Sequence, residues 1–84
     1  MHYVYLLQSE QYPEETHIGY TENVQARLAA HNNGESIHTT EHKPWTLVGY
    51  MCFKDKVAAM IFETFLKSGE GKTLTKKYFL NTAD

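Results

Sequence analysis

The sequence contains little cysteine and proline, and it has no long apolar run. Its one cysteine, Cys52, excludes an internal disulfide and a zinc site built from cysteines. A helix needs about 20 apolar residues to cross a bilayer, and no such run occurs. The N-terminus also lacks the basic and apolar segments of a signal peptide. We therefore expect a cytoplasmic protein that does not act in a membrane, with Cys52 as a small buried residue of an apolar strand.

A strong positive charge is also lacking. The 84 residues carry a formal net charge of −2, and the isoelectric point is near 6.2. This argues against a protein that coats nucleic acid by bulk charge. Glutamates crowd the N-terminal third, whereas the basic cluster near the C-terminus comprises Lys67, Lys72, Lys76 and Lys77. We therefore expect a local basic surface in the C-terminal part alone.

Apolar and aromatic residues are plentiful. They make up 42% and 13% of the chain, which is typical of a globular protein. The length fits a single domain, residues 1–84, around one small core. The patterns described below predict the order β-β-α-β-α-α. This corresponds to an α/β fold in which a small three-stranded, mainly antiparallel sheet is flanked by helices.

The first half of the chain predicts two strands and a helix. Residues 2–7 alternate with a period of two, and both faces are bulky, so this strand should be covered on both sides. A polar loop then leads to a second strand over residues 16–20. There Gly19 leaves a gap that admits a ligand or a neighbouring side chain. Thr21 is the expected N-cap of a helix that ends at Asn32-Asn33-Gly34.

The second half predicts a strand and two helices. A long polar loop precedes the strand at residues 45–53, and Asp55 should cap a helix that ends near Lys67. The Gly-containing segment 68–71 should break that helix, and a short last helix is expected over residues 74–80. The apolar residues that the first of these helices is predicted to bury are Val57, Ala58, Ile61, Phe62, Phe65 and Leu66.

Several polar residues have a plain structural interpretation when each is taken alone. Glu63 lies opposite the apolar stripe of its helix, so it is expected to face solvent and pair with Lys67 at i,i+4. Arg27 fits a helix-flank arginine whose stem lies on the sheet, and His31 a half-buried, hydrogen-bonded histidine. Tyr3 and Tyr5 fit core aromatic residues. The histidines at 38 and 42 lack a third ligand and predict no metal site.

The order of these residues along the chain resembles the GIY-YIG nuclease superfamily. The resemblance is to small single-domain members, similar to the N-terminal nuclease domain of the bacterial excision-repair incision subunit. It is carried by the segments Tyr3-Val4-Tyr5, His17-Ile18-Gly19-Tyr20-Thr21, Arg27-Leu28-Ala29-Ala30-His31-Asn32 and the helix around Glu63. Tyr3 stands where the name-giving glycine is usual, and His17 replaces the name-giving tyrosine.

The resemblance implies a metal-dependent endonuclease that hydrolyses DNA phosphodiester bonds in repair or recombination. Glu63 would hold a single Mg²⁺ or Mn²⁺ ion. Tyr5 would activate or orient the attacking water with His17, and Arg27 would stabilise the transition-state charge. His31 would orient its neighbours or contact phosphate. The residues expected to bind the DNA substrate are Tyr3, Gly19, Tyr20, Lys72 and Lys76.

Two other functions fit the sequence. A nucleic-acid-binding module that keeps this fold without catalysis would agree with His17 in the second motif and with the acidic net charge. A protein-interaction module would use exposed aromatic residues. Because the basic surface is small, a homodimer or a DNA-targeting partner protein would help any of these forms to engage duplex or branched DNA.

Overall fold

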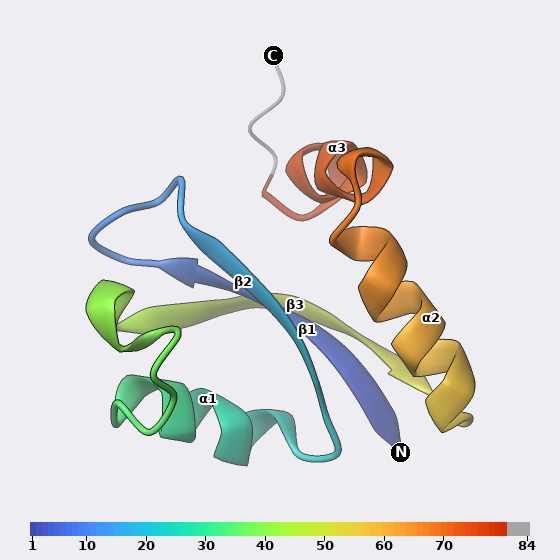
Figure 1. Cartoon of the computed structure of the whole chain (residues 1–84), viewed down its shortest axis with the longest axis horizontal. Coiled ribbons are helices and arrows are strands. Elements are labelled where there is room, and N and C mark those ends of the chain that lie inside the picture. The colour runs from blue at the N-terminus through green and yellow to red at the C-terminus, as the bar shows by residue number, and fades with distance from the viewer. Residues whose placement is uncertain (81–84) are drawn as a thin grey trace.

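The computed structural model describes residues 1–80, which form a three-stranded sheet with helices packed around it (Figure 1). The elements in chain order are β1 (His2–Ser9), β2 (Thr16–Thr21), α1 (Val24–Asn32), the 3₁₀ turn η1 (Thr40–His42), β3 (Trp45–Phe53), α2 (Lys56–Leu66) and α3 (Gly69–Tyr78). In this part of the chain, no helix combines the length and the apolar character that a membrane crossing requires.

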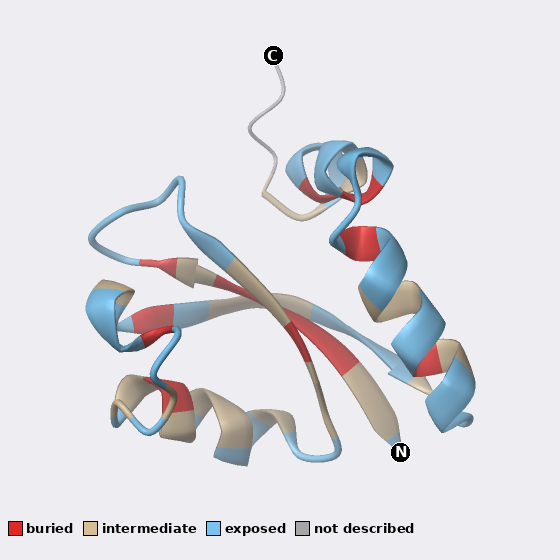
Figure 2. Cartoon of the chain, viewed as in Figure 1, coloured by how far each residue is buried: buried red, intermediate tan, exposed pale blue. Residues whose placement is uncertain are grey.

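The sheet has the order β2-β1-β3, and both pairings are antiparallel. This confirms the predicted α/β class and the predicted order of elements. Strand β1 lies in the centre, and its side chains from Val4 to Leu7 are all buried, as the two bulky faces predicted (Figure 2). The two edge strands are more exposed because each pairs on only one side.

The two faces of the sheet have separate cores. On one face, Val4 packs with Ala59 and Leu66 of α2. On the other face, Tyr5 and Leu7 pack with Trp45, and α1 covers them. Successive residues of β1 therefore serve different helices, because side chains alternate across a strand. This alternation places Tyr5, not Val4, on the face that carries the candidate site.

Helix α1 begins later than predicted. Its N-cap is Asn23, whose side-chain oxygen accepts a hydrogen bond of 3.0 Å from the backbone N–H of Ala26. Thr21 instead accepts a hydrogen bond from the backbone of Asn23, so it shapes the turn before the helix. The predicted end is confirmed, since Asn33 is the C-cap and Gly34 has a φ of +75°.

Helix α2 begins after its predicted cap, Asp55, but it presents a different face to the sheet. Val57, Ile61 and Phe65 were expected to be buried, and they are 62%, 66% and 37% exposed. Ala59 is fully buried instead, and its short side chain lets the helix backbone approach the sheet. The prediction failed because apolar residues at i, i+4 and i+8 form a stripe along a helix, and the sequence alone does not show whether that stripe faces the sheet or solvent.

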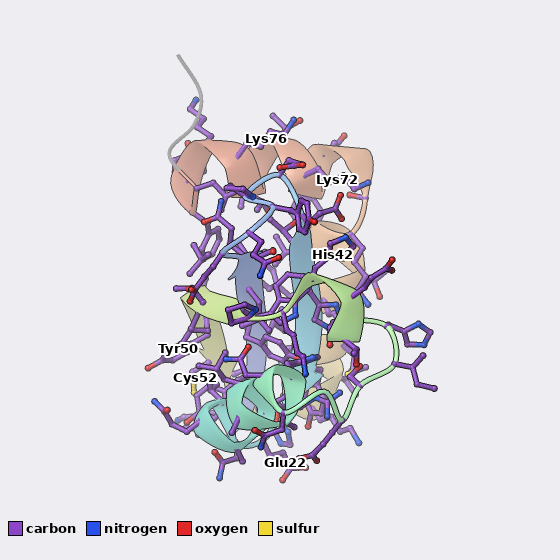
Figure 3. All side chains as sticks on the ribbon, turned by 90° about the vertical axis from the view of Figure 1, so that its left-hand side faces the viewer. Glu22, His42, Tyr50, Cys52, Lys72 and Lys76 are labelled. Atoms are coloured by element: carbon purple, nitrogen blue, oxygen red, sulfur yellow. The ribbon has the colours of Figure 1, made fainter. Side chains whose placement is uncertain are left out.

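Cys52 is exposed, so its expected burial was wrong. It lies on the edge strand β3, opposite Tyr3 in the strand register and close to Tyr50 in sequence (Figure 3). The edge position explains the error, because alternating apolar residues on an edge strand are buried only where a helix covers them.

Helix α3 begins at Gly69, which is five residues before its predicted start. Ser68 caps it, and the Ser68 hydroxyl oxygen accepts a hydrogen bond of 3.2 Å from the backbone N–H of Gly71. Gly71 is buried, and a Cβ there would lie 2.4 Å from the Cα of Leu66. The glycines therefore do not form a long non-helical segment between α2 and α3. Gly71 instead lets the first turn of α3 pack against the end of α2.

Candidate functional site

A chain of hydrogen bonds connects β1, α1 and the loop before β3. The Tyr5 hydroxyl lies 2.9 Å from Nε2 of His31, and Nδ1 of His31 lies 2.7 Å from Oγ1 of Thr39. All three residues are buried. Oγ1 of Thr39 also lies 3.5 Å from the backbone carbonyl oxygen of Ser36. If the Thr39 hydroxyl donates there, its oxygen accepts the Nδ1 hydrogen, and Nε2 is free to accept the hydrogen of Tyr5.

The loop that supplies Thr39 is held in place by the start of β3. The indole N–H of Trp45 donates a 2.9 Å hydrogen bond to the carbonyl oxygen of Thr39. The side chain of Asn32, at the end of α1, bonds both the backbone N–H and the backbone carbonyl of Trp45. Residues distant in sequence therefore fix the orientation of His31 before any ligand binds.

His17 lies beside this chain of hydrogen bonds, on the same face of the sheet. Its ring centroid is 4.8 Å from that of His31 and 6.0 Å from that of Tyr5. Burial is the main reason that the pKa of His17 falls to about 4, and four basic side chains nearby act in the same direction: His31, Lys67, Arg27 and His38. His17 is therefore a neutral imidazole at pH 7, with a donor and an acceptor but no charge.

Gly19 explains how Tyr5 fits against β2. The two residues are direct partners in the antiparallel register. A Cβ on Gly19 would lie 2.5 Å from Cζ of Tyr5 and closer still to the hydroxyl. Of the two alternatives left open by the sequence, a neighbouring side chain and not a ligand fills the gap.

Arg27 and Glu63, on different helices, both influence the pKa of Tyr5. Burial raises the pKa of Tyr5, the guanidinium of Arg27 opposes this rise, and the carboxylate of Glu63 adds to it. Arg27 comes from α1 and Glu63 from α2. Burial and the charge of Arg27 also lower the pKa of His31, so both members of the Tyr5–His31 pair favour their neutral forms.

Glu63 is less exposed than its predicted solvent-facing position would allow. The predicted pair with Lys67 forms, with 3.1 Å between Nζ and Oε2, but the Glu63 side chain is 14% exposed and the Lys67 side chain 55%. The face of α2 that packs on the sheet includes Ala59 and Leu66. Glu63 occupies the position four residues after Ala59, so it lies next to the packed face.

The possible metal ligands around Glu63 fit Mg²⁺ or Mn²⁺ better than zinc. Among residues 1–80, no group of three His, Cys, Asp or Glu side chains could enclose an ion. Zinc sites require three or four such ligands. Mg²⁺ and Mn²⁺ keep several waters and bind through one or two carboxylates and substrate oxygens. Glu63 fits this second arrangement, although Lys67 occupies one of its oxygens in the free protein.

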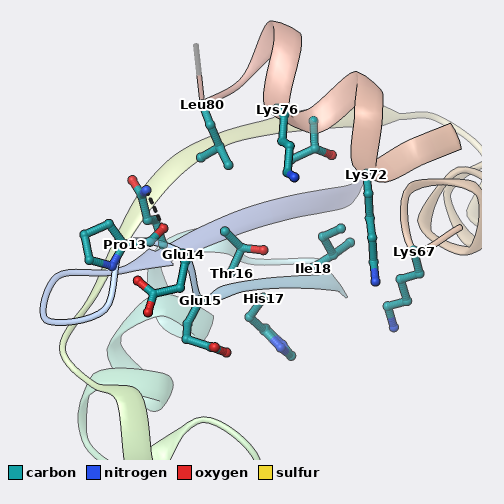
Figure 4. Close-up of a pocket in the computed structure, with 12 residues that line it drawn as sticks. Pro13, Glu14, Glu15, Thr16, His17, Ile18, Lys67, Lys72, Lys76 and Leu80 are labelled. Atoms are coloured by element: carbon teal, nitrogen blue, oxygen red, sulfur yellow. Dashed lines mark hydrogen bonds between the residues drawn. The ribbon is translucent and has the colours of Figure 1, made fainter. Parts of the chain in front are cut away.

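A cleft of about 900 Å³ opens beside His17, between β2, the β1–β2 loop and α3 (Figure 4). Lys72 and Lys76 line it, as does Lys67. The two lysines expected to bind DNA therefore share a cleft with a residue expected to be catalytic. The cleft therefore brings His17 together with three lysines, which suits the binding of phosphate. The other residues expected to be catalytic, Tyr5, Arg27, His31 and Glu63, do not line it.

Two other residues expected to bind the substrate lie elsewhere. The Tyr20 hydroxyl is 2.6 Å from Nδ1 of His2, and the Tyr20 ring packs against the Val4 core on the opposite face of the sheet. Tyr3 packs edge-on against Tyr50 near the start of α1, beside a separate, smaller pocket. Neither ring lines the cleft beside His17.

Sequence reasoning missed Thr39 and Thr75. Thr39 lies in a polar loop without periodicity, so no local pattern marks it as the partner of His31. Thr75 lines the cleft from α3, and its hydroxyl is buried without a hydrogen-bond partner in the described part of the chain. Its position, three residues after Lys72 on the same helix, is a signal that could have identified it once α3 was correctly placed.

Comparison with known proteins gives a consistent result. The family described as the GIY-YIG catalytic domain matches residues 1–78. UPF0213 proteins of Haloquadratum walsbyi and Staphylococcus haemolyticus are each 37% identical over 68 residues, covering 80% of this chain and 74% and 80% of theirs. The solution NMR structure of a UPF0213 protein from Bacillus halodurans is similar with a TM-score of 0.56 and 30% identity, covering 93% of this chain and 85% of that one.

Proposed function

Because the chain belongs to the GIY-YIG catalytic-domain family, a nuclease family, we propose that it is a divalent-metal-dependent endonuclease that hydrolyses DNA phosphodiester bonds. Repair or recombination of duplex or branched DNA in the cytoplasm is the role that best fits such an activity. The observation that supports it most directly is the hydrogen bond between Tyr5 and His31, on a phenol whose pKa both Arg27 and Glu63 influence.

Tyr5 and His31 together provide a route for the proton of the attacking water. The phenol oxygen takes a proton from water while the phenol hydrogen passes to Nε2 of His31, 2.9 Å away. The resulting hydroxide forms the new bond to phosphorus. A phenol alone is a poor base at pH 7, so the neutral His31 is the group that makes this transfer feasible. His17, also neutral, would orient the water through its ring nitrogens.

Arg27 and a metal ion held by Glu63 would stabilise the negative charge that develops during the reaction. The guanidinium of Arg27 would bind the phosphate oxygens as negative charge builds on them, until the bond to the leaving oxygen breaks. Glu63 is the residue that would hold Mg²⁺ or Mn²⁺, and the bound ion would supply positive charge for the attacking or leaving oxygen. Lys67 would leave Glu63 when an ion binds there and would be free to contact phosphate.

The proposal is tested by incubating the purified protein with duplex, flap and branched DNA in Mg²⁺ or Mn²⁺. We expect nicking that a chelator abolishes, and a loss of at least about 100-fold in kcat for Glu63→Gln and Tyr5→Phe. Glu41→Gln is the matched control, because Glu41 is an exposed carboxylate outside this site. Absence of cleavage on every substrate, or unchanged cleavage by Glu63→Gln, would refute the proposal.

A catalytically inactive nucleic-acid-binding module is the second candidate. It is favoured by the Glu63–Lys67 ion pair, which keeps a cation on the carboxylate proposed to hold the metal. In that case DNA binding would depend on salt but not on chelator, and Glu63→Gln would bind as well as the wild type. Because the net charge is −2, a second copy of the chain or a DNA-targeting partner would raise the affinity for DNA of either the nuclease or the inactive module.

A further inference from the structure

The cleft beside His17 extends beyond the residues that the proposed chemistry needs. It continues along α3 to Lys72, Thr75 and Lys76, and it ends near Leu80. Because side chains three and four positions apart share one side of a helix, Lys72 has both Thr75 and Lys76 as neighbours. Two lysines and a threonine therefore line one stretch of cleft wall.

Thr75 is the unusual member of this group. It is 5% exposed, and Oγ1 has no hydrogen-bond partner among residues 1–80. Other helical threonines of the chain do not show this, since Thr64 and Thr73 each donate to the carbonyl four residues earlier. A buried hydroxyl without a partner costs stability. Thr75 lines the cleft, and threonine in a helix has two accessible χ1 rotamers, so no partner among residues 1–80 fixes the orientation of its oxygen.

Opposite charges divide the cleft. Glu14 and Glu15 project from the β1–β2 loop at one end, while Lys67 and Lys72 lie at the other, with His17 between them (Figure 4). A phosphate would be repelled by the glutamates and attracted by the lysines. An anion entering the cleft is therefore directed towards Lys67 and Lys72, next to the α3 wall that carries Thr75.

We propose that Lys72, Thr75 and Lys76 form a second phosphate subsite, which takes a backbone phosphate of the bound DNA strand next to the one that is cut. This proposal rests on the proposed function for the identity of the ligand. The lysines neutralise the phosphate, and the Thr75 hydroxyl donates a hydrogen bond to one of its oxygens. Binding at this subsite fixes the position of the strand relative to His17 and Tyr5.

The lysines are tested by measuring the affinity for fluorescein-labelled single-stranded and duplex oligonucleotides in excess chelator. Lys72→Gln and Lys76→Gln should each weaken binding and lower the slope of log affinity against log salt by about one. Lys77→Gln is the matched control, since Lys77 lies on the same helix but contacts the Tyr78 ring and does not line the cleft. Equal effects of all three substitutions would overturn the subsite.

Thr75→Val tests the hydroxyl. Valine has nearly the same shape and removes a buried polar group that has no partner, so the free protein should be at least as stable as the wild type. Oligonucleotide affinity should nevertheless fall about tenfold, because a hydrogen bond to a charged phosphate is lost. Unchanged affinity would show that Thr75 only packs. Thr73→Val, exposed on α3, is the control and should bind normally.

The two proposals fail in different ways. If the wild type binds oligonucleotides and Thr75→Val weakens that binding, but no DNA is cut in Mg²⁺ or Mn²⁺, the subsite stands and the nuclease activity does not. If DNA is cut and neither Lys72→Gln nor Thr75→Val raises KM, the nuclease activity stands and the subsite is refuted. Binding by the wild type to neither probe would refute the subsite as well.

Discussion

Tyr5 and His31 lie 26 positions apart in the sequence, and their side chains share a buried hydrogen bond of 2.9 Å. The bond joins the central strand to α1 across the face of the sheet where the candidate site lies. It depends on Thr39, which fixes the other ring nitrogen of His31. Three segments of the chain must therefore fold together before Tyr5 has a proton acceptor.

We expect Thr39→Val to destabilise the protein by about 1–3 kcal/mol, because it leaves Nδ1 of His31 buried without a partner. The free energy of unfolding, measured by urea denaturation, checks this. Thr64→Val is the control, since Thr64 is exposed and bonds only within α2, and it should change stability by less than about 0.5 kcal/mol. Equal stabilities of the two variants would show that the Thr39 bond contributes nothing.

Gly19→Ala should destabilise by about 1–3 kcal/mol, because the added methyl group overlaps the ring of Tyr5. Tyr5 would have to move, which should lengthen its bond to His31 and lower kcat as well. Thermal unfolding and single-turnover cleavage measure the two effects. Gly69→Ala is the comparison, because no atom lies within 4 Å of the Cβ it would add. A Gly19→Ala protein as stable as Gly69→Ala would contradict the close fit of Tyr5.

Much of the fold could be predicted from local patterns. The alternation over residues 2–7, the aromatic strand at residues 45–53 and the Asp55 cap all appear in the structure. Each of these patterns involves residues only a few positions apart, so it can be recognised from the sequence alone. The inward face of α2 was mistaken because Val57 and Ile61 are apolar yet exposed, and only the packing of Ala59 on the sheet distinguishes the two faces.

The candidate site was predicted only as a set of residue types in order. The influence of both Arg27 and Glu63 on the pKa of Tyr5 depends on how two helices pack against the sheet, which no local pattern determines. Thr39 was missed for the same reason. Tyr20 was assigned to the substrate from its place in a motif, although alternation along β2 turns it to the other face.

Lys67→Met should increase the affinity of the protein for Mn²⁺ several-fold, because it removes the ammonium that lies 3.1 Å from the Glu63 carboxylate. Isothermal titration calorimetry without DNA measures this affinity directly. Stability should change little, since an i,i+4 ion pair contributes about 0.3–0.5 kcal/mol. Lys77→Met, on α3, is the control. Weaker Mn²⁺ binding by Lys67→Met would show that Lys67 does not compete for Glu63.

The low pKa of His17 should make the protein less stable in mild acid. In the unfolded chain a histidine takes up a proton near pH 6.5, whereas in the folded protein His17 does so only near pH 4. Between these values the unfolded state binds more protons, so the stability that is fully present above pH 6.5 falls as the pH is lowered towards 4. A pKa difference of this size corresponds to a loss of at most about 3 kcal/mol. His31, whose pKa is also lowered, acts in the same direction.

Urea unfolding at several pH values between 4 and 7 tests this expectation. His17→Gln should flatten the curve in this range, because glutamine takes up no proton in either state. His38→Gln is the comparison, since His38 lies exposed in the loop before β3 and is the smallest of the influences on the pKa of His17, so the slope should change far less. A wild-type curve that His17→Gln does not flatten would mean that the folded protein does not lower the pKa of His17. His17 would then take up a proton near pH 6.5, and its part in orienting the attacking water would be lost below that pH.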